Sequence, residues 1–273
     1  MTLLVRDEED IVRSNIEFHL SRGVDFVIAM DNLSVDRTPQ ILREYEAQGR
    51  LRYIQQLDDD YSQHRWVTDM ARLAHVEHGA DWVINNDADE FWWPADGDLK
   101  QVLASAAASC NAMEARRVNF PAADVPPGAF FADVMTVRES RSFKASGAPL
   151  SGKVCHRASA DIEVAQGNHA VRFGGRAAPA ARAPITILHF PMRSYRQFAN
   201  KIAKGGAAYG RNTSLEPAAG GAWRRLHRLY EAGELEAYYR SLIPDEATME
   251  EGLRSGRFVS EDRLKRALSD LDH

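Results

Sequence analysis

Short apolar runs alternate with segments of helical periodicity along the first third of the chain. The apolar runs predict four strands, over Leu3–Val5, Val24–Met30, Leu51–Ile54 and Trp82–Asn86. Between them, apolar residues recur at helical spacing in three segments that end near Gly23, Gly49 and Gly79. Thr38, which precedes Pro39, is predicted to be the N-cap of the second helix. The pattern therefore predicts strand and helix units in succession.

The remaining two thirds of the chain have a weaker pattern. After a predicted helix around Leu99–Ala106, short strands are expected over Ala112–Phe120, Ala132–Arg138, Lys153–His156, Asn168–Val171 and Ile185–Phe190. The Gly-, Ala- and Arg-rich segment Gly174–Pro184 is predicted to be a surface loop. Ser194 is predicted to cap a helix that ends at Gly205-Gly206, and three or four small amphipathic helices are expected from there through Leu268.

Alternating strands and helices predict an α/β fold, a Rossmann-like and mostly parallel sheet with flanking helices, followed by a helical C-terminal extension. We expect a catalytic domain over residues 1–206 and the extension over residues 207–273. In such sheets, ligands bind beyond the carboxyl ends of the strands. Charged residues follow the first, second and fourth predicted strands, so we expect a shared ligand-binding edge made by Arg6, Asp7, Asp31, Asp87 and Asp89.

Composition narrows the class of protein. The 273 residues are 44% hydrophobic and 27% charged, as in ordinary globular proteins, and the net charge of −5 argues against nucleic-acid binding. Two cysteines are too few for a disulfide scaffold, which favours a reducing compartment. No apolar run approaches the roughly 20 residues of a membrane span. The predicted location is cytoplasmic, with peripheral attachment to the inner face of the membrane left open.

The segment Asp81–Pro94 carries the most specific chemistry. Its apolar run ends in three carboxylates, Asp87, Asp89 and Glu90, and then returns at once to aromatic residues. Clustered carboxylates repel one another unless a positive charge lies between them, and oxygen ligands suit a hard divalent cation. The segment therefore predicts a metal site. A solvated acidic turn that caps the next element is the alternative.

Several segments in a fixed order resemble the family 2-like glycosyltransferases of the A-type fold, in the bacterial branch with an Asp-x-Asp-Glu-Phe motif. The resemblance covers roughly residues 3–206. It rests on Val5–Glu8, Asp31–Thr38, Gln63–Ala71, Trp82–Phe91 and Leu188–Tyr195, the last of which leads to Lys201. It implies a sugar transferase that acts in cell-surface polysaccharide biosynthesis with a nucleotide-sugar donor, UDP- or GDP-linked.

The resemblance also implies roles for single residues. Asp87 and Asp89 are expected to hold Mn²⁺ or Mg²⁺ together with the donor diphosphate. His189, which ends an apolar strand, is our candidate for a third metal ligand, and a core or capping histidine is the alternative. Asp31 is expected to bind the nucleobase, beside Arg6 or Asp7, although Asp7 also suits a helix N-terminus. The remaining candidate donor contacts are Arg65 and Lys201.

The catalytic base is less defined by the sequence. Inverting enzymes of this type use a carboxylate beyond the metal motif to deprotonate the acceptor hydroxyl. No plain acidic pair is present, and the candidates are His169, in the polar turn Gly167-Asn168-His169, and Glu90, which alternatively orients the metal loop. Other side chains in the expected region are Asp133, Asp161 and Glu163.

The sequence thus predicts a metal-dependent glycosyltransferase that acts by inverting displacement on a glycan, lipid-linked or protein acceptor. The segment Lys201–Arg211 is either a lid over the donor or a flexible loop between helices. A non-catalytic sugar-nucleotide or glycan-binding protein is the main alternative. A nucleotidyltransferase is disfavoured because no glycine-rich phosphate loop follows the first strand.

Overall fold

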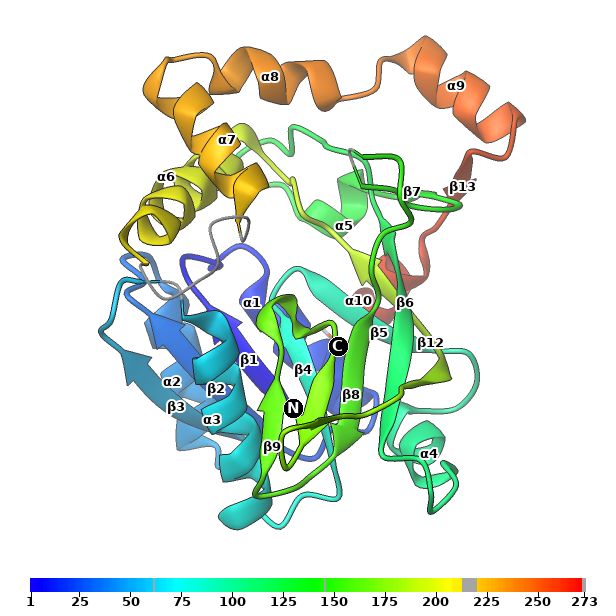
Figure 1. Cartoon of the computed structure of the whole chain (residues 1–273). Helices are drawn as coiled ribbons and strands as arrows, with labels where there is room; N and C mark the ends of the chain where they lie inside the picture. Colours follow the sequence, from blue (N-terminus) through cyan, green and yellow to red (C-terminus); the bar gives the residue numbers. More distant parts are fainter. Residues whose placement is uncertain (61, 145, 213–219, 272–273) are drawn as a thin grey trace. The chain divides into compact units, whose positions relative to one another are not determined.

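The strands predicted in the first third of the chain lie side by side in a parallel sheet (Figure 1). We describe the protein from a computed structural model that covers residues 1–60, 62–144, 146–212 and 220–271. The parallel strands are β1 (Thr2–Val5), β2 (Val27–Asn32), β3 (Leu51–Gln56) and β4 (Trp82–Asp87). Val5 pairs with Asp31 and Leu4 with Asp87, so the register brings the expected charged residues to one edge.

Four further strands extend this sheet. They are β5 (Glu90–Pro94), β6 (Ala112–Asn119), β8 (Lys153–Arg157) and β12 (Ala181–His189). Among the described residues the sheet has eight strands in the order β3-β2-β1-β4-β8-β6-β12-β5. β8 runs antiparallel to both β4 and β6, and β12 runs antiparallel to β5. The predicted α/β class, with a large sheet flanked by helices, is confirmed.

Successive side chains of the central strands point to opposite faces of the sheet, and both faces are apolar. Val83 and Val154 belong to one buried cluster, and their neighbours Ile84 and Cys155 belong to the other. The first cluster is covered by α3 (Gln63–Val76), through Trp66, and by a small antiparallel sheet. That small sheet comprises β9 (Ile162–Val164), β10 (Val171–Phe173) and β11 (Arg176–Ala177).

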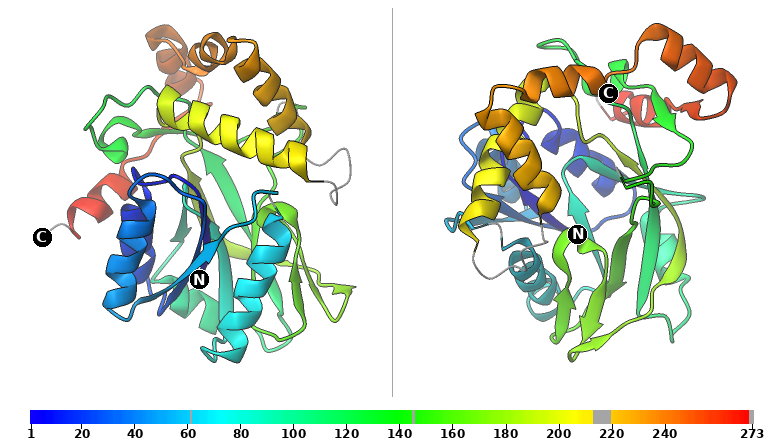
Figure 2. Two further views of the ribbon diagram at one scale, coloured as in Figure 1. Left: turned by 90° about the vertical axis from the view of Figure 1, so that its left-hand side faces the viewer. Right: turned by 45° about the horizontal axis from the view of Figure 1, so that its top comes forward.

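Helices cover both faces of the large sheet, and each lies in a connection between two strands. α1 (Val12–Ser21) and α2 (Thr38–Ala47) contact each other on the face opposite α3 (Figure 2). α4 (Leu99–Ala104) buries Leu99 and Leu103 in the second apolar cluster, and Asp98 caps it by accepting a hydrogen bond from Gln101 N–H. Each strand and helix unit thus returns the chain to the same edge of the sheet.

The chain divides into two units. The first comprises Met1–Leu57, Ser62–Arg117 and Phe143–His189, and it contains nearly all of the large sheet. The second comprises Asp58–Tyr61, Val118–Ser142 and Phe190–His273. Within the second unit, Phe198 and Ile202 of α6 (Tyr195–Arg211) pack with Leu235 and Tyr239 of α8 (Leu235–Leu242). Its other elements are α5 (Phe131–Val134), β7 (Val137–Glu139), α7 (Gly221–Glu231), α9 (Glu246–Arg254), β13 (Phe258–Ser260) and α10 (Arg263–Ser269).

Most predicted elements before residue 100 are present, but the cap assigned to Thr38 is wrong. Thr38 is the first residue of α2, and its Oγ1 accepts a hydrogen bond from Glu8 N–H at 2.9 Å. The side chain therefore ties the loop after β1 to α2. Ser194, by contrast, caps α6 as predicted, because its side chain accepts from Gln197 N–H.

Several predictions in the later part of the chain are wrong in detail. The strand expected over Ala132–Arg138 is α5 followed by β7, and the segment expected as a strand over Asn168–Val171 begins in the 3₁₀ turn η1 (Gln166–Asn168). The loop expected over Gly174–Pro184 contains β11 and the start of β12. β7 and β12 pair with distant strands, β13 and β5, and local composition does not contain that information.

The predicted end of the helix at Gly205-Gly206 is also wrong, because α6 continues to Arg211. The segment Lys201–Arg211 is therefore helical, so the alternative of a flexible loop is wrong, and its role as a lid stays a prediction. None of the helices in the described ranges is long and apolar enough to cross a membrane.

Candidate functional site

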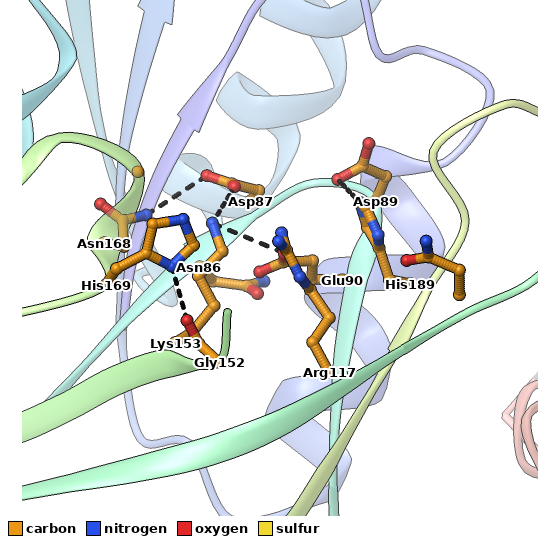
Figure 3. Close-up of polar contacts among 12 residues, drawn as sticks. Asn86, Asp87, Asp89, Glu90, Arg117, Gly152, Lys153, Asn168, His169 and His189 are labelled. Carbon is orange, nitrogen blue, oxygen red and sulfur yellow. Dashed lines mark hydrogen bonds and ion pairs between the residues drawn. The ribbon is translucent and has the colours of Figure 1, made fainter. Parts of the chain in front are cut away.

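The acidic segment forms a tight turn between β4 and β5. Asp87 ends β4, Asp89 lies in the turn, and Glu90 begins β5. Asn15 of α1 stabilises the turn by donating from Nδ2 to the carbonyl oxygens of Ala88 (2.9 Å) and Glu90 (2.8 Å). Because Ala88 and Asp89 form a turn between the two strands, the three carboxylates do not alternate along one extended strand, and each meets different partners (Figure 3).

Asp89 lies against His189, the last residue of β12. Asp89 Oδ1 and His189 Nε2 are 3.6 Å apart, and both side chains are largely buried. The pairing of His189 with Glu90 in the sheet produces this arrangement. Two ligands of one Mn²⁺ or Mg²⁺, each about 2.1 Å from the ion, lie roughly 3 to 3.5 Å apart. The observed 3.6 Å is slightly longer than this spacing, so a small movement of either side chain would bring both atoms to one cation.

Asp87 is held by two other side chains. Lys153 Nζ forms a short ion pair with Asp87 Oδ2, and Asn168 Nδ2 donates to Asp87 Oδ1 at 3.3 Å. Asn168 is buried and has a φ of 61°, a left-handed conformation that is unusual for any residue but glycine. Asp87 itself remains 29% exposed. Its carboxylate is therefore fixed in orientation and still accessible.

Glu90 is completely buried beneath the turn. Its Oε1 accepts a hydrogen bond from Arg117 Nη1 at 2.9 Å and lies 3.5 Å from Lys153 Nζ. Its Oε2 is buried without a hydrogen-bond partner. Burial raises the pKa of Glu90 to about 7, although Lys153 and Arg117 oppose the shift. A buried carboxylate in this setting can orient the residues above it, and the expected role of Glu90 as a base stays a prediction.

His169 ends the polar turn Gly167-Asn168-His169 next to Asp87. Its Nδ1 lies 2.6 Å from the carbonyl oxygen of Gly152. Because a carbonyl oxygen only accepts, Nδ1 carries the proton, and Nε2 of the neutral ring keeps its lone pair. Burial and the charge of Lys153 lower the pKa of His169 to about 4. The ring is therefore neutral near pH 7, and Nε2 is its hydrogen-bond acceptor.

A second group of predicted residues lies at the ends of β1 and β2. Asp31 is buried and accepts hydrogen bonds from Ser34 N–H and Tyr53 O–H, each at 3.3 Å. Burial raises the pKa of Asp31. Asp7, whose φ is 54°, donates its N–H to Ser34 Oγ and accepts from Val35 N–H. The structure thus joins Asp7 and Asp31 through one interlocked pair of loops.

The other candidates are more dispersed. Arg6 follows β1, and Arg65 is exposed near the start of α3. Lys201 lies on α6, and Asp133 pairs with Lys265 at 3.0 Å, both within the second unit. Asp161 accepts a short hydrogen bond from Ser159, and Glu163 is exposed on β9. The structure does not tie Asp161 or Glu163 to the acidic turn, and their roles remain predictions.

The donor chemistry of the turn fits a divalent cation only in part. A carboxylate and an imidazole face each other at Asp89 and His189, whereas Asp87 is engaged by Lys153 and Asn168. Within the described part of the chain, no three His, Cys, Asp or Glu side chains are grouped as metal ligands. Magnesium-type sites often use one or two protein ligands and complete the shell with substrate phosphates and water. The residues present fit a site of that kind.

Sequence reasoning missed Lys153 and Arg117. Both lie in strands that were predicted, but neither was chosen as a site residue. A basic side chain in a strand, such as a lysine at its start, usually reaches solvent. A signal was present in Lys153-Val154-Cys155-His156, where a cation opens a strand that is otherwise buried. Only the order of the strands, with β8 beside β4, shows that this cation faces the acidic turn.

The fold is an α/β fold in which acidic residues follow the carboxyl ends of parallel strands. Residues 2–163 match the sequence model of glycosyltransferase family 92. Because that match spans more than half of the chain, the protein belongs to glycosyltransferase family 92. The predicted enzyme class is confirmed, and the family matched is family 92, where the sequence resemblance indicated family 2.

Two solved structures illustrate the likeness at the level of fold. The structure of Staphylococcus aureus TarS residues 1–349 is 13% identical, with a TM-score of 0.42, and the alignment covers 93% of this chain and 90% of that one. The complex of the same protein with UDP-GlcNAc is 11% identical, with a TM-score of 0.45 and coverages of 94% and 91%. No curated protein sequence matches the chain.

Proposed function

We propose that this protein transfers a sugar from a nucleotide-sugar donor, UDP- or GDP-linked, to an acceptor hydroxyl in a reaction that depends on Mn²⁺ or Mg²⁺. The facing pair Asp89 and His189, at the carboxyl edge of a sheet in a glycosyltransferase family, is the observation that carries the proposal. Asp87 completes the site beside them. A bound cation would neutralise the donor diphosphate and stabilise the departing nucleoside diphosphate.

Donor binding is assigned to the loops after β1 and β2. Asp31 offers a buried carboxylate for nucleobase hydrogen bonds, and Asp7 with Arg6 forms the adjoining wall. Arg65 and Lys201 are proposed to contact the donor phosphates, where a cation is favoured. The acceptor class, whether glycan, lipid-linked or protein, is not defined by these residues.

His169 is the proposed base. Its Nε2 lone pair accepts the proton of the acceptor hydroxyl while the oxygen attacks the anomeric carbon and the bond from that carbon to the diphosphate breaks. One direct displacement inverts the anomeric centre. The fixed tautomer of His169, and its greater exposure, favour this residue over Glu90, which is fully buried and bonded to Arg117.

Turnover of nucleotide sugars tests this proposal. Release of UDP or GDP is measured with an acceptor panel, with Mn²⁺ or with chelator, for the wild type, Asp89→Asn and His189→Ala. We expect metal-dependent release that falls at least 100-fold in both variants. Asp96→Asn, which changes an exposed carboxylate beyond β5, is the matched control and should retain turnover. Donor binding without release under every condition would instead indicate a non-catalytic binding protein.

A further inference from the structure

Lys153 is a buried lysine whose ammonium group lies against the acidic turn, Asp87–Glu90. It is the first residue of β8, and its side chain is 2% exposed. Its ammonium lies between two carboxylates, forming a short ion pair with Asp87 and lying 3.5 Å from Glu90 Oε1 (Figure 3). The register of β8 against β4 and β6 fixes this position, because Cys155 pairs with both Ile84 and Met113.

The surroundings keep this lysine charged. Taking an ammonium out of water costs several kcal/mol, so a buried lysine persists only where carboxylates compensate it. Lys153 and Arg117 together balance the charges of Asp87 and Glu90. The acidic turn is therefore largely neutralised from beneath by the protein itself.

We propose that Lys153 is a positioning residue, a built-in counterion that holds Asp87 and weakens the affinity of the acidic turn for a free divalent cation. A cation is then retained only when the donor diphosphate supplies further oxygen ligands. Retention of the cation with the donor rests on the proposed function. The effect of Lys153 on the affinity for a free cation does not.

Electrostatics gives the direction of the effect. An ammonium in contact with Asp87 repels any cation that approaches the same carboxylate. Two unit charges about 5 Å apart at an effective dielectric constant of about 20 interact strongly enough to change an equilibrium constant by more than tenfold. Removing the lysine charge should therefore raise the affinity for a cation, whereas damage to the fold would lower it. The direction of the change in cation affinity therefore distinguishes loss of the charge from loss of the fold.

The test is a titration of the protein with Mn²⁺ alone, in which the electron paramagnetic resonance signal measures the concentration of free Mn²⁺. Lys153→Met should bind Mn²⁺ at least tenfold more tightly than the wild type, and Lys153→Gln, which keeps a polar group, should change in the same direction. Lys100→Met is the control, because it removes a lysine of an exposed ion pair with Asp25 and should leave Mn²⁺ binding unchanged. Circular dichroism establishes that each variant is folded.

A double variant shows whether Lys153 acts through Asp87. In the Asp87→Asn background, Lys153→Met should increase Mn²⁺ affinity by a smaller factor than in the wild type, because only the repulsion through space remains. Equal or weaker Mn²⁺ binding by both folded Lys153 variants would overturn the inference, whatever the donor does. If Mn²⁺ affinity rises as expected but the wild type binds no nucleotide sugar, the proposed function fails and the role of Lys153 stands.

Discussion

Gly167 shows how a single residue positions the proposed base. Its φ is 78°, and a Cβ at this position would lie 2.8 Å from His169 Cδ2 and 2.9 Å from His169 Nε2. The absence of a side chain therefore leaves room for the imidazole. Asn168, with its own left-handed backbone, then turns its amide towards Asp87. One short turn orients two side chains of the site.

Gly167→Ala should accordingly displace His169 and lower kcat by at least tenfold. Gly175 is a matched control, because its φ is 75° and nothing lies within 4 Å of its absent Cβ. Alanine at either position costs about 1 to 2 kcal/mol through the left-handed backbone. Thermal unfolding should therefore report similar losses, and turnover should fall only for Gly167→Ala. Equal kcat values for the two variants would remove His169 from the proposed mechanism.

The carboxylates of the site could be predicted from sequence because they follow apolar runs that end at one edge of a parallel sheet. Asp87, Asp89 and Asp31 were predicted in this way, and their binding roles stay predictions. Lys153 and Arg117 could not be, since their closeness to the turn depends on antiparallel pairing across more than sixty residues of chain, between β4 and β8. Charge compensation from distant strands leaves no local pattern.

At the scale of elements, His19 joins α1 to β5. Its Nδ1 donates to Asn15 O at 2.7 Å, and its Nε2 accepts from Trp92 N–H at 3.2 Å. Burial lowers the pKa of His19 to about 3. The neutral ring has both nitrogens paired, whereas a protonated ring would direct an N–H at another N–H.

This histidine predicts a pH dependence of stability. The unfolded state binds a proton near pH 6.5 and the folded state only near pH 3, so the contribution of His19 is complete above pH 6.5 and is lost as the pH falls. Relative to His19→Leu, the wild type should lose about 1.4 kcal/mol of unfolding free energy per pH unit below 6.5. Urea denaturation at several pH values measures this difference. A difference that does not vary between pH 7 and pH 5 would contradict the account.

Two glycines allow α6 and α7 to approach closely. A Cβ on Gly205 would lie 2.5 Å from Trp223, and one on Gly206 would lie 2.5 Å from His227. The sequence pattern predicted a helix end at this pair because glycine often follows a helix. Here tertiary packing explains the glycines instead. A local signal cannot distinguish these two uses of glycine.

Alanine substitutions in α6 test this packing. Gly205→Ala should lower the unfolding free energy by about 1 to 3 kcal/mol, because Trp223 must move. Gly210→Ala lies in the same helix with nothing within 4 Å of its Cβ, and it should be neutral or stabilising by up to about 1 kcal/mol. Chemical denaturation of both variants gives the comparison. A stabilising Gly205→Ala would show that the two helices do not pack closely.

At the scale of the whole molecule, the parallel pairing of the first four strands was predictable, whereas the antiparallel pairing of the later strands was not. Strand and helix units from Thr2 to Asp87 follow from local periodicity, and their right-handed crossovers fix the edge where ligands bind. β5, β8 and β12 join by long-range pairing, which places Glu90 beside His189. The predicted metal residues thus depend on a part of the fold that periodicity did not define.

A site with few protein ligands should bind its cation and donor together. Mn²⁺ alone, or a nucleotide sugar alone, is expected to raise the melting temperature little, and the two together by several degrees. At a donor concentration of 100 times Kd, the stabilisation is about 2.7 kcal/mol. Differential scanning fluorimetry measures the three shifts. Additive shifts of the two ligands would contradict a shared site.

The most direct test of the central claim is calorimetric titration of UDP- and GDP-linked sugars, with and without Mn²⁺, into the wild type and Asp89→Ala. The account predicts donor binding that requires Mn²⁺ in the wild type and is lost in the folded variant. Binding that is equally strong without metal, or unchanged in Asp89→Ala, would contradict the assignment of the acidic turn as a metal-assisted donor site.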